Sequence, residues 1–157
     1  MNTLKIVYED NHIIVTDKPA GILTQGDYSG ETSLLEMIKE HVRIKYNKPG
    51  EAFIGLVHRL DRPVSGLLVF ARTSKAAARL QKEFISGRIK KFYLAVVETS
   101  SELNPGWNKL ENFLERERDV TRIVPGATSK SEKAVLYYHE LARGINFSLM
   151  LIKLDTG

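Results

Sequence analysis

Short apolar segments separated by turn residues dominate this sequence and restrict its fold more than any other feature. Leu4–Tyr8 and His12–Thr16 are rich in β-branched and apolar residues and flank a polar turn, a pattern typical of two paired strands. Further strands are predicted over Phe53–Val57, Leu67–Ala71, Ile89–Glu98, Leu110–Glu115, Thr121–Val124, Lys133–Leu141 and Phe147–Leu154. Many strands in irregular order, with few helices, predict a mixed α+β fold with a largely antiparallel central sheet and flanking helices.

Two segments have the apolar spacing of helices. The first begins at Ser33, which forms a capping-box sequence with Glu36, and its apolar side comprises Leu34, Leu35, Ile38 and Val42. The second begins at Thr73 or Ser74 and ends at Gly87, with Ala77, Leu80 and Phe84 on its apolar side. Because the chain has no internal repeat, low-complexity tract or flexible linker, residues 1–157 are predicted to form one domain.

Composition excludes several classes of protein. The 157 residues are 43% hydrophobic and 27% charged, which is ordinary for a globular domain. The longest apolar run, Gly66–Ala71, is far shorter than the roughly 20 residues that span a bilayer. Acidic residues near the start do not fit a signal peptide, so we expect a cytoplasmic protein. Cysteine is absent, which excludes disulfides, thiol nucleophiles and cysteine-ligated zinc.

Basic residues are concentrated in the middle of the chain. The segment from His58 to Lys91 contains nine basic residues and only two acidic ones, whereas the rest of the chain is slightly acidic. Such a block indicates a surface that binds a polyanion, although a solvated helix face has the same composition. The basic residues are Arg59, Arg62, Arg72, Lys75, Arg79, Lys82, Arg88, Lys90 and Lys91.

The segment His58–Gly66 is the most unusual local sequence. It places Asp61 between Arg59 and Arg62, in a loop between two predicted strands. Neighbouring guanidinium groups favour an ionised carboxylate, which suits a nucleophile, a base or an anionic partner better than a general acid. The alternative is that Asp61 only fixes the loop through an ion pair.

Other kinds of catalytic site find little support. His58, Asp61 and Ser65 lack the Gly-x-Ser-x-Gly sequence of a hydrolase nucleophile. The four histidines lie far apart without metal-ligand spacing, so no metal site is predicted. No second carboxylate is marked as a partner of Asp61 for glycoside hydrolysis, and no glycine-rich phosphate-binding pattern occurs.

The loop and its surroundings identify a family. His-Arg-Leu-Asp-Arg-Pro-Val-Ser-Gly-Leu at 58–67, with Val69-Phe70-Ala71-Arg72-Thr73, resembles the RluA family of RNA pseudouridine synthases. The segments Ile6–Asp10, Val15–Gly21 and Lys90–Ala95 are similar to the family's opening strands, its Lys-Pro-x-Gly turn and its Lys-x-Tyr strand. The resemblance covers essentially the whole chain and implies the pseudouridine synthase fold.

The resemblance implies an RNA-modifying isomerase that converts uridine to pseudouridine in structured RNA, either ribosomal RNA or tRNA, without cofactor or metal. It implies that Asp61 is the catalytic aspartate and that Arg59 occupies the space of the flipped base. Tyr93 is expected to stack on uracil and to assist proton loss at C5. The residues then expected to bind RNA phosphates are Arg72, Lys75, Arg79, Lys82, Arg88, Lys90 and Lys91.

Two departures from the family pattern qualify this expectation. Val64 stands where the family usually has threonine, so that hydroxyl group is absent. After Leu154-Asp155-Thr156-Gly157 the family continues into Arg-x-His-Gln-Ile-Arg, which supplies a basic partner for the aspartate. We therefore expect residues 1–157 to be a catalytic domain of the kind without an S4-type module, lacking its C-terminal portion. The alternative function is a non-catalytic RNA-binding protein that retains the synthase fold.

Overall fold

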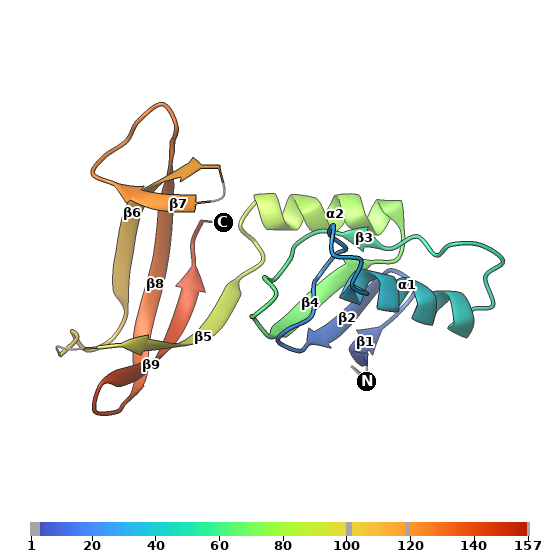
Figure 1. The fold of residues 1–157 in the computed structure, drawn as a ribbon, viewed down its shortest axis with the longest axis horizontal. Coiled ribbons are helices and arrows are strands. Elements are labelled where there is room, and N and C mark those ends of the chain that lie inside the picture. Colours follow the sequence, from blue (N-terminus) through green and yellow to red (C-terminus); the bar gives the residue numbers. More distant parts are fainter. Residues whose placement is uncertain (1–3, 100–101, 119, 157) are drawn as a thin grey trace. The chain divides into compact units, whose positions relative to one another are not determined.

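The computed structural model describes residues 4–99, 102–118 and 120–156. Contacts within the chain divide it into two compact units, Met1–Ser86 and Gly87–Gly157 (Figure 1). Each unit contains one antiparallel sheet, which confirms the α+β class. The division of the strands between two sheets was not indicated by the sequence pattern. Within the described residues, no helix has both the length and the apolar character needed to cross a membrane.

The sheet of the first unit has the order β1-β2-β4-β3. Its strands are β1 (Lys5–Glu9), β2 (Ile13–Lys18), β3 (Gly55–Leu56) and β4 (Gly66–Ala71). The predicted strand Phe53–Val57 is wrong in extent, because only two of its residues pair with β4. The residues before Gly55 do not pair in the sheet, and two of them, Ala52 and Ile54, are buried in the hydrophobic core.

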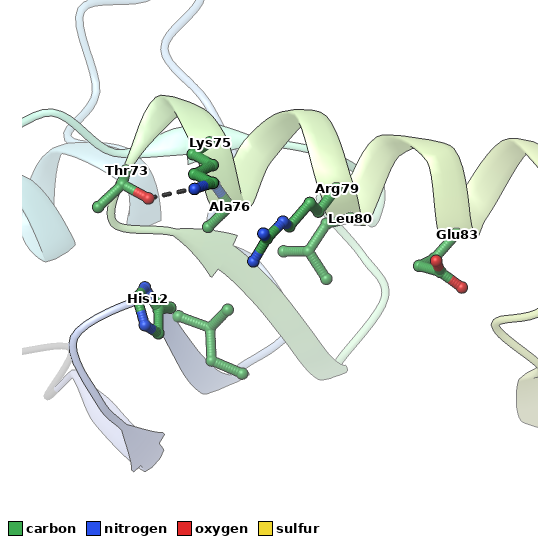
Figure 2. Close-up of a pocket in the computed structure, with 8 residues that line it drawn as sticks. His12, Thr73, Lys75, Ala76, Arg79, Leu80 and Glu83 are labelled. Atoms are coloured by element: carbon green, nitrogen blue, oxygen red, sulfur yellow. Dashed lines mark hydrogen bonds between the residues drawn. The ribbon is translucent and has the colours of Figure 1, made fainter.

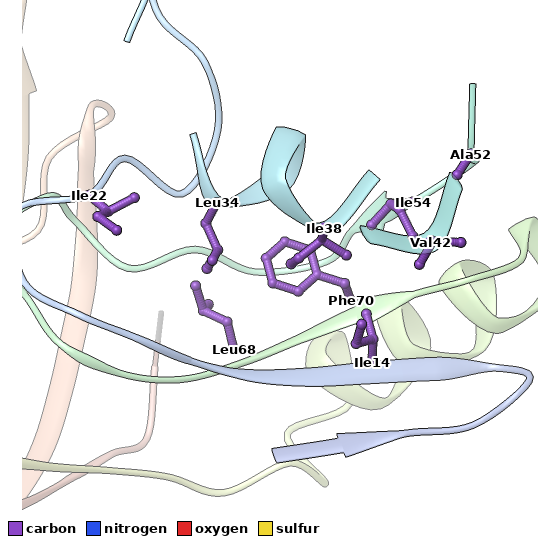
Figure 3. Packing of buried hydrophobic residues seen from close by; sticks show 9 residues of the cluster. All are labelled: Ile14, Ile22, Leu34, Ile38, Val42, Ala52, Ile54, Leu68 and Phe70. Atoms are coloured by element: carbon purple, nitrogen blue, oxygen red, sulfur yellow. The ribbon is translucent and has the colours of Figure 1, made fainter. Parts of the chain in front are cut away.

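Helix α1 (Leu34–Lys45) covers one face of this sheet and builds the core. Its N-terminus has the predicted capping box, in which Ser33 and Glu36 satisfy each other's backbone N–H groups. Leu34, Ile38 and Val42 of α1 pack against alternate strand residues Ile14, Leu68 and Phe70 (Figure 3). Because side chains alternate along a strand, these residues define the face of the sheet that α1 covers.

Helix α2 (Ser74–Ile85) lies on the opposite face. Thr73 is its N-cap, and its side chain accepts a hydrogen bond from the Ala76 amide at 3.1 Å. Gly55 permits close packing here, because a Cβ at this position would lie 2.9 Å from the Ala77 Cβ. Gly87 follows the helix with a φ of 68°, the left-handed conformation expected of a C-terminal glycine.

The sheet of the second unit has the order β5-β9-β8-β6-β7, and every described pair is antiparallel. Its strands are β5 (Lys91–Glu98), β6 (Asn108–Glu117), β7 (Val120–Val124), β8 (Ser131–Arg143) and β9 (Phe147–Leu154). The sequence predicted all five strands. At most of their ends, the observed boundary differs from the predicted one by a few residues. The register of β5 and β9 places Tyr93 opposite Ile152 and Phe92 opposite Lys153.

Candidate active site

The loop that carries Asp61 connects β3 to β4, and hydrogen bonds to its backbone hold it in place. The carbonyl group of Arg62 accepts hydrogen bonds from the Gly21 amide at 2.8 Å and from Lys18 Nζ at 3.2 Å. On the other side of Asp61, the hydroxyl of Thr24 donates to the Leu60 carbonyl at 2.6 Å and accepts from the Leu60 amide at 3.3 Å. Both neighbours of Asp61 are therefore fixed to the segment that follows β2.

Lys18 is the most deeply buried charged group of this site. It ends β2 in the Lys-Pro-Ala-Gly turn, and its side chain is fully buried. Its ammonium group donates to three carbonyl oxygens, those of Pro19 (3.2 Å), Ile22 (2.9 Å) and Arg62 (3.2 Å). Burial lowers the pKa of Lys18, and the negative charge of Asp61 acts in the opposite direction. Lys18 thus connects the turn to the Asp61 loop mechanically and electrostatically.

Two further side chains of the loop, those of His58 and Arg62, also have structural partners. His58 Nε2 accepts a hydrogen bond from the Val69 amide at 3.0 Å, and the imidazole packs on the ring of Phe84 at 4.7 Å between centroids. Arg62 donates to the Gly21 carbonyl at 3.1 Å and to Glu31 at 2.8 Å. Arg59 and Asp61 are exposed, so the fixed loop presents both to solvent.

Tyr93 lies on β5, in the second unit, and the Asp61 loop lies in the first. Burial raises the pKa of the Tyr93 phenol, so the hydroxyl is protonated at neutral pH and can donate a hydrogen bond. The role of Tyr93 at the uracil remains a prediction.

The seven residues predicted to bind phosphate differ in their surroundings. Lys75, Arg79 and Lys82 are exposed on α2, and Lys75 and Arg79 line a groove of about 460 Å³ between α2 and the start of β2 (Figure 2). Arg88 and Lys90 are exposed between α2 and β5, and Lys91 is half-buried at the start of β5. That these six residues bind RNA phosphates remains a prediction.

Arg72 differs from the other six because its side chain is only 8% exposed. It pairs with Glu9 at 3.3 Å, donates to the Asp10 carbonyl and lies 4.2 Å from the Tyr46 ring centroid. Glu9 is itself 6% exposed and also binds Lys45 at 2.8 Å. This ionic cluster joins the end of β1 to α1 and β4, so Arg72 has a structural function that a count of charges does not reveal.

The sequence did not indicate the roles of Lys18 and Thr24. Lys18 belongs to a turn that the family resemblance includes, but nothing local predicts a buried ammonium bound by three carbonyl groups. Thr24 has no sequence signal, because its importance comes from Leu60, which lies 36 residues further along the chain.

Comparison with known proteins agrees with this geometry. Residues 12–157 match the family described as RNA pseudouridylate synthase. The chain is 29% identical to ribosomal large subunit pseudouridine synthase D of Borreliella burgdorferi over 98% of its own length and 48% of that protein. It is 32% identical to the protein of the same name from Zymomonas mobilis, over 98% of this chain and 49% of that protein. The chain therefore spans about half the length of these relatives.

A solved structure titled human RNA pseudouridylate synthase domain containing 4 has the same fold. It superposes with a TM-score of 0.78 at 19% identity, over 98% of this chain and 59% of that one. The family match covers almost every described residue, including the loop of Asp61 and its anchors. This chain belongs to the RNA pseudouridylate synthase family.

Proposed function

We propose that this chain carries the catalytic centre of an enzyme that isomerises uridine to pseudouridine in RNA, with Asp61 as the catalytic carboxylate. The observation that carries the proposal is the fixed backbone on both sides of Asp61 within a chain of this family. A rigid loop holds a reacting group in one orientation and so lowers the entropic cost of reaching the transition state.

The reaction needs no external reactant. The N1–C1′ bond of uridine breaks, the uracil turns, and C5 forms a bond to C1′. The C5 hydrogen leaves as a proton and N1, which carries no hydrogen in uridine, gains one, so atoms and electrons balance without an oxidant. Asp61 has three available roles, which are attack on C1′, addition to the uracil ring and removal of the C2′ proton.

We propose ribosomal RNA as the substrate, because the relatives cited above are named for the large ribosomal subunit. The alternative substrate is tRNA. The test is release of tritium from RNA labelled at uridine C5, with 23S ribosomal RNA and total tRNA as separate substrates. The full-length Zymomonas mobilis relative serves as positive control. Release from ribosomal RNA alone supports the proposal, release from tRNA alone overturns the substrate, and release from neither overturns the activity of this chain.

Thr24 provides a test of the loop anchor. Thr24→Val keeps the shape of the side chain but removes the hydroxyl group that binds both the carbonyl and the amide of Leu60. We expect kcat for tritium release to fall roughly tenfold to a hundredfold, because small displacements of a reacting group are costly. Thr24→Ser retains the hydroxyl and is the matched control. Equal kcat values for the Val and Ser variants would show that the anchor has no part in catalysis.

RNA binding is expected to depend steeply on salt. The exposed cations Lys75, Arg79 and Lys82 lie along one helix, and each contact to a phosphate releases counterions. We expect Arg79→Gln to reduce the slope of log K against log salt by roughly 0.7 to 0.9. Fluorescence anisotropy at several salt concentrations measures this slope. A salt-independent affinity would contradict the electrostatic contribution.

A further inference from the structure

A cluster of aromatic and basic side chains lies on the second sheet, and only one of its members, the predicted phosphate ligand Lys90, has a role in the account above. A hollow of about 290 Å³ is lined by Lys90, Phe92, Trp107, Tyr137 and Lys153. All five belong to the same unit, Gly87–Gly157, and come from β5, β8, β9 and the segments before β5 and β6. We refer to them as the aromatic cluster.

The register of the strands explains why these side chains meet. Lys153 of β9 is directly opposite Phe92 of β5 on one side and Tyr137 of β8 on the other. Residues that are directly opposite in antiparallel strands project from the same face of a sheet. Lys153 therefore lies between two aromatic residues in this row, and its Nζ is 5.6 Å from the Tyr137 ring centroid.

Trp107 extends this row and is held in place before a ligand arrives. Its ring packs on His139 with centroids 5.7 Å apart, and His139 Nδ1 is 3.0 Å from the Gly106 carbonyl oxygen. The turn before it is closed by Asn108, whose side-chain amide donates to the carbonyls of Asn104 and Gly106. A ring that is ordered in advance loses little entropy when a ligand stacks on it.

The aromatic cluster is open to solvent and carries only positive charge. Phe92 is 52% exposed and Trp107 is 50% exposed, although burial of such rings is strongly favourable. None of the residues that line the hollow is acidic. Exposed rings beside lysines bind the bases and phosphates of single-stranded nucleic acid, whereas a purely apolar protein partner would leave the ammonium groups without counter-charges.

We propose that the aromatic cluster is a stacking site for an unpaired nucleotide of the RNA, with the base on Phe92 and Trp107 and the adjacent phosphates on Lys90 and Lys153. This proposal rests on the proposed function for the identity of the polymer. Phe92 and Tyr93 are consecutive in β5, so their side chains lie on opposite faces of the sheet. The stacked nucleotide is therefore different from a uridine bound at Tyr93, and an RNA that contacts both crosses the outer edge of the sheet at β5.

Trp107 is the single tryptophan of the chain, so its fluorescence reports on this site directly. The probe is a short oligouridylate, added to the full chain, with the same oligonucleotide annealed to its complement for comparison. We expect saturable quenching by the single strand and at least tenfold weaker quenching by the duplex. Absence of saturable quenching by the single strand would overturn the proposal.

Variants separate stacking from general charge attraction. Phe92→Leu keeps the apolar bulk but removes the ring, and we expect it to raise the Kd for oligouridylate about tenfold. The matched control is Val96→Gln, which changes a 70% exposed residue on the same face of β5 outside the hollow and should leave the Kd unchanged. An unchanged Kd for Phe92→Leu would overturn the proposal. Conversion of a dimer to a monomer by Phe92→Leu, measured by sedimentation, would assign the face to a second copy of the chain instead.

Failure of the stacking site and failure of the proposed enzyme activity give different results in these experiments. Asp61-dependent tritium release without quenching at Trp107 would retain the enzyme and reject the stacking site. Saturable quenching that Phe92→Leu weakens, without tritium release from any RNA, would retain the stacking site and reject the enzyme.

Discussion

Replacement of Asp61 by asparagine is expected to lower the rate of tritium release from uridine C5 by about 10³-fold or more. Asparagine has nearly the shape of aspartate but neither its negative charge nor its capacity to act as a nucleophile or base. The loop itself should persist, because its anchors bind the backbone of Leu60 and Arg62 and not the Asp61 side chain. The measurement is a single-turnover time course on labelled ribosomal RNA.

RNA binding provides the internal control for this variant. Since the Asp61 side chain is exposed, we expect the Kd for RNA to change by less than about threefold, a difference under 1 kcal/mol. Asp27→Asn, a second exposed aspartate of the first unit, should leave both the rate and the Kd unchanged. If Asp61→Asn retained a tenth of the wild-type rate, Asp61 would not be the catalytic carboxylate.

Replacement of Glu9 by glutamine is expected to reduce the free energy of unfolding by about 3 to 5 kcal/mol. Glu9 is buried and accepts hydrogen bonds from His41 (3.1 Å), Lys45 (2.8 Å) and Tyr46 (2.9 Å), in addition to the ion pair with Arg72. Loss of its charge leaves the guanidinium of Arg72 buried without its carboxylate, which is the costly way to break a buried ion pair. Urea unfolding at neutral pH measures the change.

The same cluster predicts how stability depends on pH. Burial alone would raise the pKa of Glu9, but the hydrogen bonds from Lys45, His41 and Tyr46 outweigh burial and lower the pKa to about 2. A carboxyl group whose pKa is lower in the folded state than in the unfolded state stabilises the fold at pH values above its unfolded-state pKa, which is near 4.5 for Glu9. We expect this contribution, roughly 3 kcal/mol, to disappear as the pH falls from 4.5 towards 2. The acid-induced loss should be smaller by this amount in Glu9→Gln, and an equal loss in both proteins would contradict the role of the cluster.

The sequence predicted those parts of the fold that depend on local signals. The capping box at Ser33 and Glu36 specifies the start of α1 because its hydrogen bonds join residues three apart. Strand β9 coincides with the predicted Phe147–Leu154 because all of its residues except Ser148 and Lys153 are apolar. The predicted strand Phe53–Val57 was too long because burial of Ala52 and Ile54 against α1 replaces pairing in the sheet.

The candidate site was predictable only in part, because its geometry comes from distant pairs of residues. The motif around Asp61 identified the family. Its anchors, however, are distant in sequence: Lys18 lies 44 residues before its partner Arg62, and Thr24 lies 36 residues before its partner Leu60. The charge pattern placed Arg72 among the expected phosphate ligands, although Glu9 and Tyr46 surround it in the fold. Neither local propensity nor net charge encodes which strand residues become neighbours, so the aromatic cluster also emerged only from the register of β5, β9 and β8.

The most direct test of the central claim is analysis of the nucleosides in the RNA product. Ribosomal RNA is incubated with the full chain or with Asp61→Asn, digested to nucleosides and separated by chromatography with mass detection. The account predicts a new nucleoside with the mass of uridine and a different retention time, formed by the wild-type chain and absent with Asp61→Asn. RNA that is bound by the wild-type chain yet yields only unmodified uridine would contradict the account and favour a non-catalytic RNA-binding protein.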